Sequence, residues 1–134
     1  MKATVVGSPT LYYFDVKQFH FHGGAEHTIN GKRHELEMHI VHEQPCHTLD
    51  RPFAVLGIIF RAGKENAFLH KLIKYSEVRW DLLFPHRIQD YLAYKGGLTT
   101  PGCMECVNWF IWGELFEASQ AQIDYISGRK TRRM

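Results

Sequence analysis

The sequence has no long hydrophobic run, and this absence excludes a membrane-spanning helix. No apolar stretch in its 134 residues approaches the length of about 20 that a bilayer requires. The first residues also lack the apolar core of a signal peptide, so the chain as written is not marked for export, which points to the cytoplasm without settling the compartment. Internal repeats and low-complexity linkers are absent too. We therefore expect a single domain over residues 1–134.

The sequence also lacks an excess of charge of either sign. Lys and Arg number 16, Asp and Glu number 14, and the net charge is +2. Four basic residues fall within 129–134, and without them the balance is 12 basic against 14 acidic residues, or −2. A nearly neutral body without a basic stripe argues against nucleic acid as a partner. The basic end is interpreted as a solvated terminus.

Cysteine is scarce, with only Cys46, Cys103 and Cys106 in the chain. An odd number of cysteines cannot pair completely. Cys103 and Cys106 have the spacing of a redox or metal motif, but one such motif on a predicted strand is weak evidence for either function.

Histidine, by contrast, is abundant, with nine copies, and His20, His22 and His39 of one predicted hairpin carry the strongest signal. Side chains alternate along a strand, so His20 and His22 share a face. An Asn-Gly pair predicts a two-residue turn, and pairing Ile29 with Lys32 across it makes paired positions sum to 61. This register puts His22 opposite His39. Three neutral imidazoles that converge on one point, with a fourth position open, are typical of a catalytic zinc site.

Two polar side chains are placed to hold the second nitrogens of these rings. Gln18 shares a face with His20, and Glu37 shares a face with His39. Histidines bound to zinc nearly always have such a partner. The sequence therefore predicts a Zn²⁺ site with three histidine ligands and Gln18 and Glu37 behind them.

Elsewhere the patterns predict mostly strands. Asn66–Tyr75 has apolar residues at helical spacing, and Ser119 followed by Gln122 resembles a capping box that opens a short helix. The predicted strands are Leu11–Phe21, Lys32–Glu43, Phe53–Arg61 and one strand or a pair of strands within Leu98–Leu115. The sequence thus predicts a mainly β (α+β) fold.

Several segments, in this order, resemble alpha-class carbonic anhydrases of the bacterial type. The segments are FHFHGGAEHTINGKRHELEMHIVH, AVLGIIF and YKGGLTTPGCMECVNW, and the likeness runs from about Tyr12 to about Tyr125. It implies a large twisted, mostly antiparallel central sheet with short peripheral helices and the metal at its centre. It also implies a domain shortened at both ends, without the usual histidine proton shuttle. Sheet edges exposed by this shortening lead us to hypothesise a homodimer.

The resemblance also assigns roles to individual residues. It implies that zinc-bound hydroxide attacks carbon dioxide to give bicarbonate and a proton, and that sulfonamides and anions inhibit the reaction. Thr99 matches the threonine that accepts the hydroxide's hydrogen, Glu26 matches the glutamate that receives the hydrogen of that threonine, and Thr100 helps to place substrate or inhibitor. The apolar wall for carbon dioxide would consist of Val41, Val55, Leu98, Val107 and Trp109.

Two glycines depart from the family pattern. Gly23 and Gly24 stand where the family usually carries bulkier residues, and the predicted register puts Gly24 opposite Glu37. We therefore expect less rigid surroundings for Glu37.

Two alternatives stay open. A non-catalytic carbonic-anhydrase-related zinc-binding or structural module would keep the same histidines. A cupin-like protein would instead use Glu26 as a direct ligand, because His20-x-His22-x3-Glu26 also fits the first cupin motif. The LTTP segment and the spacing of Glu37 and His39 favour the carbonic anhydrase interpretation.

Overall fold

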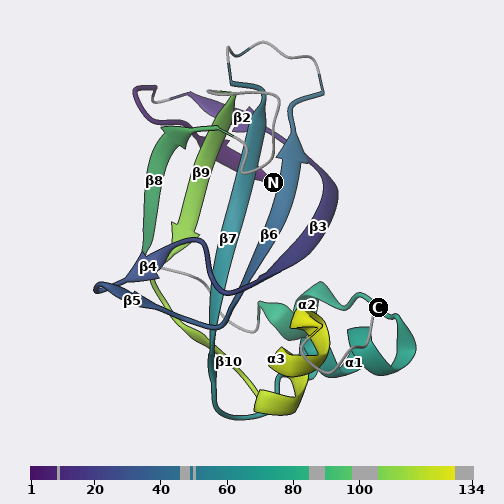
Figure 1. The fold of residues 1–134 in the computed structure, drawn as a ribbon. Helices are drawn as coiled ribbons and strands as arrows, with labels where there is room; N and C mark the ends of the chain where they lie inside the picture. The colour runs from purple at the N-terminus through teal and green to yellow at the C-terminus, as the bar shows by residue number, and fades with distance from the viewer. Residues whose placement is uncertain (9, 46–48, 50, 85–89, 98–105, 129–134) are drawn as a thin grey trace. The chain divides into compact units, whose positions relative to one another are not determined.

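The computed structural model describes residues 1–8, 10–45, 49, 51–84, 90–97 and 106–128 (Figure 1). The strands are β1 (Lys2–Thr4), β2 (Leu11–Tyr13), β3 (Asp15–Gly23), β4 (Thr28–Ile29), β5 (Lys32–Arg33), β6 (Leu36–Glu43), β7 (Phe53–Ala62), β8 (Tyr91–Gly96), β9 (Val107–Trp112) and β10 (Phe116–Ala118). The helices are α1 (Ala67–Tyr75), α2 (Trp80–Leu83) and α3 (Gln120–Ser127). Within the described residues, no helix has the length and apolar character needed to cross a membrane.

Two compact units divide the chain. The first consists of Met1–His20, His39–Gly57 and Tyr91–Gly113. The second consists of Phe21–Met38, Ile58–Asp90 and Glu114–Met134.

The main sheet confirms the predicted mainly-β fold. Its strands follow the order β3-β6-β7-β9-β8, and β10 also pairs with β7 (Figure 1). β8 is antiparallel to β9, whereas β7 is parallel to both β9 and β10, so the sheet is mixed. Parallel neighbours need a long connection, and the segment with α1, α2 and β8 supplies it between β7 and β9.

In the first unit, β7 and β9 carry much of the core. Phe53 pairs with Val107 and Val55 with Trp109, while Tyr94 of β8 pairs with Trp109 from the other side. Residues opposite each other in a sheet share a face, so these side chains lie on one side of the sheet. The near-continuous burial of β7 fits its position between two neighbouring strands.

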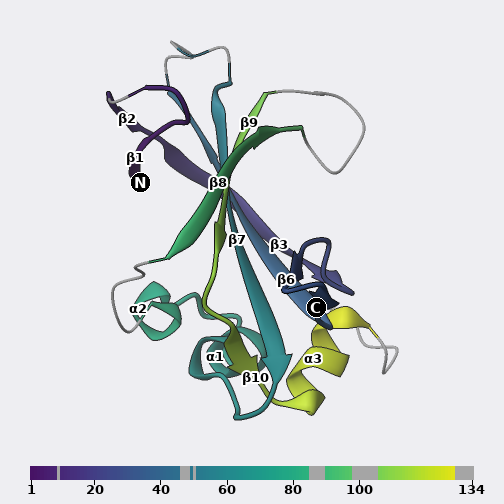
Figure 2. The same ribbon diagram turned by 90° about the vertical axis from the view of Figure 1, so that its left-hand side faces the viewer.

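In the second unit, both longer helices begin at side-chain caps. Asn66 accepts the N–H of Leu69 at the start of α1. Ser119 and Gln122 form the predicted capping box at the start of α3, which confirms that prediction. Gln122 also accepts the N–H of Asn66 (2.9 Å) and donates to its carbonyl (2.9 Å). These bonds tie the two helix starts together, at the end of β7 where β10 also lies (Figure 2).

The small hairpin of β4 and β5 has the predicted register. Ile29 pairs with Lys32 and Thr28 with Arg33, so paired positions sum to 61. Asn30 and Gly31 both have positive φ, 51° and 78°, as a type I′ turn requires. The register prediction is therefore confirmed next to the turn.

Further from the turn the register changes by two residues. Gly24 donates to the carbonyl of Glu35 (2.7 Å), so Gly24 lies beside Glu35, and the prediction that it lies opposite Glu37 is wrong. The reason is that Glu26 and His27 are extra residues on one side of the hairpin, in the manner of a bulge. A shift of two residues leaves every side chain on its predicted face, because the side-chain period of a strand is two.

Gly23 and Gly24 both stand at positions where a larger residue would be strained. Gly24 has a φ of 82°, which L side chains rarely adopt. A Cβ on Gly23 would lie 2.7 Å from the Cβ of Ser127 in α3, closer than real Cβ contacts. The backbone geometry thus accounts for both departures from the family pattern.

Candidate metal centre

Three histidines from neighbouring strands form the candidate metal centre. His20 and His22 come from β3 and His39 from β6. One ring nitrogen of each lies within 4.8 Å of those of the other two. The His20 and His39 rings meet edge to face with centroids 5.3 Å apart. His39 is buried, and the other two are half-buried.

The donor set fits a zinc ion. Two nitrogen ligands at 2.0–2.1 Å from a tetrahedral ion lie about 3.4 Å apart, within the 4.8 Å that spans this group. All three candidate donors are imidazoles, which suit zinc.

Two of the rings have polar partners at their second nitrogen. Oε1 of Gln18 lies 2.8 Å from Nδ1 of His20. Oε2 of Glu26 lies 3.5 Å from Nδ1 of His22. A metal bound by such a ring would be held by Nε2, because Nδ1 faces the polar partner.

Glu37 is the centre of a second polar group, which we call the Glu37 cluster: Glu37, His27 and the backbone amide of Glu26. The Glu37 side chain is fully buried. One carboxylate oxygen accepts the N–H groups of Glu26 (2.9 Å) and His27 (2.8 Å), and the other lies 2.6 Å from Nδ1 of His27. The carboxylate thus binds two amides of the two-residue bulge.

Glu37 also lies near His39, the histidine whose second nitrogen it was predicted to hold. Its oxygen, a nitrogen of His27 and a nitrogen of His39 form a group within 4.8 Å of one another. Sequence reasoning missed the bonds to His27 and to the two amides. Only knowledge of the bulge would have found them, because a bulge frees amides that then need another acceptor.

His42 plays a structural part. It lies three residues after His39, hence on the other face of β6. Its Nδ1 lies 3.0 Å from the carbonyl of Ile40 and 3.2 Å from that of Ala54, so these two carbonyls are partners of the ring. Burial lowers the pKa of His42 below 6.5, against the opposing effect of the two carbonyls.

An aromatic side chain packs directly on the centre. The Trp109 ring meets His39 edge-on with centroids 5.0 Å apart, and the Tyr94 ring stacks parallel to it with centroids 6.1 Å apart. Nε1 of Trp109 donates to the carbonyl of Gly97 (3.0 Å), which satisfies the one polar atom of the indole. The tryptophan is therefore held on both sides as well as at its polar end.

The other described wall residues share this environment. Val55 faces the same side as Trp109 because the two are paired, and Val107 does so because it is two residues away. Val41 lies on the face of His39 by the same rule. All three valines are buried.

Several predicted residues lie outside the part of the chain that the structure describes. These are Leu98, Thr99, Thr100, Cys46 and Cys103. Cys106 is disulfide-bonded.

Comparison with known proteins agrees with this geometry. The family model of eukaryotic-type carbonic anhydrase matches residues 1–133. Alpha carbonic anhydrase 8 of Arabidopsis thaliana is 33% identical over 123 residues, which cover 82% of this chain and 31% of the relative. A carbonic anhydrase of Nostoc sp. is 34% identical over 129 residues, 82% of this chain and 45% of the relative. The chain thus spans less than half the length of these two relatives.

Comparison with a solved structure also supports a carbonic anhydrase fold. The alpha-carbonic anhydrase of Thermovibrio ammonificans, in complex with the inhibitor sulfanilamide, superposes with a TM-score of 0.75 at 34% identity. The match covers 91% of this chain and 59% of that chain. These matches exclude the cupin alternative and confirm the resemblance found in the sequence. The chain belongs to the eukaryotic-type carbonic anhydrase family, with alpha-class enzymes among its relatives.

Proposed function

We propose that this chain catalyses the reversible hydration of carbon dioxide to bicarbonate and a proton, with a zinc ion held by His20, His22 and His39. The observation that carries the proposal is the convergence of three imidazole nitrogens beside Trp109 in a chain of this family. When bound, zinc lowers the pKa of a water molecule to about 7 and so provides a nucleophile at neutral pH.

The chain's own residues prepare the site in two ways. Gln18 and Glu37 orient the histidine rings, Gln18 through a 2.8 Å contact to His20. The buried side chains of Val41, Val55, Val107 and Trp109, with Leu98, present an apolar surface to an apolar substrate.

Thr99 and Glu26 are proposed to orient the attacking oxygen. The Thr99 hydroxyl accepts that oxygen's hydrogen and donates its own hydrogen to Glu26, so one lone pair points at carbon dioxide. Thr100 helps to place the substrate or a sulfonamide. Support comes from Glu26, whose carboxylate lies 3.5 Å from Nδ1 of His22 and hence close to the ligand set.

Stopped-flow carbon dioxide hydration by the zinc-loaded protein tests the proposal. The concentration of imidazole buffer is varied, and sulfanilamide is added in a parallel series. We expect a rate above background that sulfanilamide abolishes. A rate that also rises with buffer would mean that the buffer carries the proton away from the site. Zinc bound at one ion per chain without such a rate would favour the alternative, a non-catalytic carbonic-anhydrase-related module.

Thr99→Ala separates orientation of the nucleophile from metal binding. We expect the variant to keep its zinc and to lose hydration activity by on the order of 10²-fold, as a misplaced reacting group does. Thr4→Ala, on the exposed side of β1, is the matched control. Hydration as fast as in the parent would show that Thr99 does not orient the attacking oxygen.

We also propose that residues 1–134 fold as one domain and that the chain forms a homodimer through its sheet edges. β3 and β8 end the main sheet among the described strands, and β8 exposes Tyr91 and Leu92. Coincident urea transitions of residues in the two units would support one cooperative domain. Light scattering that finds a stable monomer at high concentration would contradict the dimer.

A further inference from the structure

We propose that Tyr94 and Gly96 of β8 are positioning residues of the metal centre. They hold the Trp109 indole against His39 and thereby set the position of the apolar surface on which carbon dioxide lies. This role rests on the function proposed above, and it extends the site to a strand that contributes none of the three histidines.

The pairing of β8 with β9 places both residues beside Trp109. Tyr94 pairs directly with Trp109, and Gly96 pairs with Val107, two residues earlier on β9. Because residues two apart on a strand share a face, Tyr94, Gly96 and Trp109 lie on the same face of the sheet. The Tyr94 ring stacks on the indole at an interplanar angle of 7°. One flat side of the indole therefore has a fixed partner.

Gly96 leaves the space that the indole occupies. A Cβ on Gly96 would lie 3.0 Å from Cδ1 and 3.2 Å from Nε1 of Trp109, and 3.1 Å from Cε2 of Tyr94. These distances are tighter than most real Cβ contacts, so a larger residue would displace one of the two rings by a few tenths of an ångström. Displacement of the indole would also strain the 3.0 Å hydrogen bond from its Nε1 to the carbonyl of Gly97.

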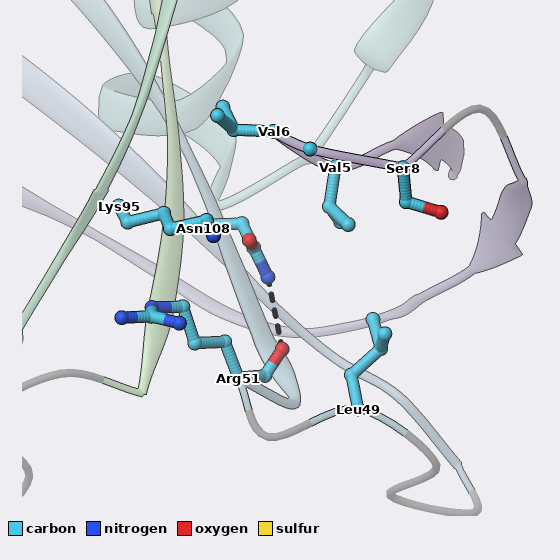
Figure 3. A pocket seen from close by; sticks show the side chains of 8 residues that line it. Val5, Val6, Ser8, Leu49, Arg51, Lys95 and Asn108 are labelled. Carbon is cyan, nitrogen blue, oxygen red and sulfur yellow. Dashed lines mark hydrogen bonds between the residues drawn. The ribbon is translucent and has the colours of Figure 1, made fainter.

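The backbone of β9 is anchored at this point, so a displacement falls on the indole itself. β9 lies between β7 and β8 in the main sheet. Asn108 precedes Trp109 and therefore faces the opposite side. Its buried side chain donates to the carbonyls of Arg51 (2.9 Å; Figure 3) and Phe53 (3.2 Å). Lys95, the pairing partner of Asn108 in β8, shares that opposite face.

A displaced indole affects the metal centre through His39. The two rings meet at an interplanar angle of 72° with centroids 5.0 Å apart, and His39 is buried. Close packing means that no void absorbs a shift of the indole. A misplacement of about 1 Å can cost about 10²-fold in rate, so a few tenths of an ångström should cost less than that.

Two variants that disturb the indole in opposite ways test the proposal. Tyr94→Ala removes the stacked ring, and Gly96→Ala adds one carbon beside the indole. We expect each to lower kcat/KM for carbon dioxide hydration by about two- to tenfold, the range of one aromatic pair, with zinc content unchanged. Tyr94→Phe should restore the parent value, and Lys95→Ala, an exposed neighbour on the opposite face, should leave it unchanged.

A second readout does not depend on activity. In the zinc-free chain with ¹³C-labelled histidine, the ring resonances of His39 report the ring current of the adjacent indole. They should shift in Tyr94→Ala and Gly96→Ala and should stay at the parent positions in Tyr94→Phe and Lys95→Ala. A loss of folding in one of the first two variants leaves the other to decide.

The two readouts separate this proposal from the proposed function. Unshifted His39 resonances in both Tyr94→Ala and Gly96→Ala would overturn it, whatever the activity of the parent. Shifted resonances with an unchanged kcat/KM would overturn the effect on the substrate. Losses as large in Tyr94→Phe as in Tyr94→Ala would assign the effect to the hydroxyl group and contradict positioning by the stacked ring. A parent without hydration activity would refute the proposed function, and the resonances alone would then decide whether β8 holds the indole.

Discussion

The three-histidine group and the Glu37 cluster both contain histidine, but they differ in how their polar atoms are arranged. In the Glu37 cluster, an acceptor carboxylate meets two amide donors and an imidazole nitrogen at 2.6–2.9 Å. In the three-histidine group, ring nitrogens of one kind converge within 4.8 Å. Complementary groups stabilise each other, whereas three imidazole nitrogens that converge could hold a metal ion. The comparison teaches that the first arrangement stabilises the fold, and we propose that the second binds zinc.

The largest effect should come from removing a ligand. His39→Ala should weaken zinc binding by more than 10²-fold, since the loss of an outer partner alone costs about 10–100-fold. Zinc content after dialysis against a chelator measures this. His70→Ala, an exposed histidine beside Glu65, is the control and should keep its zinc. Full zinc content in His39→Ala would mean that other residues hold the ion.

The second largest effect should be on folding. Glu37→Ala leaves the part-buried amides of Glu26 and His27 without their described acceptor, and each unsatisfied group costs about 1–3 kcal/mol. We expect a loss of about 3 kcal/mol or more in the free energy of unfolding of the zinc-free chain, measured in urea. Glu77→Ala, at an exposed carboxylate, should change it by less than about 1 kcal/mol. Equal losses would contradict a stabilising role for the cluster.

A smaller effect should follow from Gln18→Ala. Loss of the contact to Nδ1 of His20 should weaken zinc binding by about tenfold without unfolding the protein. Competition with a metal-sensitive dye gives the affinity. Lys17→Ala, the neighbour on the opposite face of β3, is the control. Unchanged affinity in Gln18→Ala would show that the glutamine does not position the ring.

The smallest effect concerns pH and His42. Because burial lowers its pKa in the folded state below 6.5, the unfolded chain binds more protons just below pH 6.5. Stability is therefore fully present above pH 6.5 and falls as the pH drops toward the folded pKa, by at most about 1.4 kcal/mol per pH unit. The difference between the zinc-free parent and His42→Gln, measured in urea at several pH values, isolates this contribution. A difference that does not vary with pH would contradict it.

Local patterns predicted much of the fold and of the candidate centre. Strand β7, helix α1, the Ser119 capping box and the turn at Asn30 all depend on neighbours within a few residues, so a single sequence contains their signals. β8 was not predicted, because its exposed edge lacks a clear alternation of apolar and polar residues. Its pairing with β9 is a long-range contact that no local pattern encodes.

The sequence by itself determined that His20, His22 and His39 share a face, since the two-residue period of a strand and the register set by the Asn-Gly turn require it. A register shift of two residues at Glu26 and His27 left that face unchanged. Only the tertiary structure decided which groups Glu37 binds, because they depend on a bulge. It also decided that Trp109 packs on His39, because Trp109 comes from a strand distant in the sequence. The sheet face on which a side chain lies follows from local periodicity, whereas the groups that it contacts depend on how the rest of the chain folds.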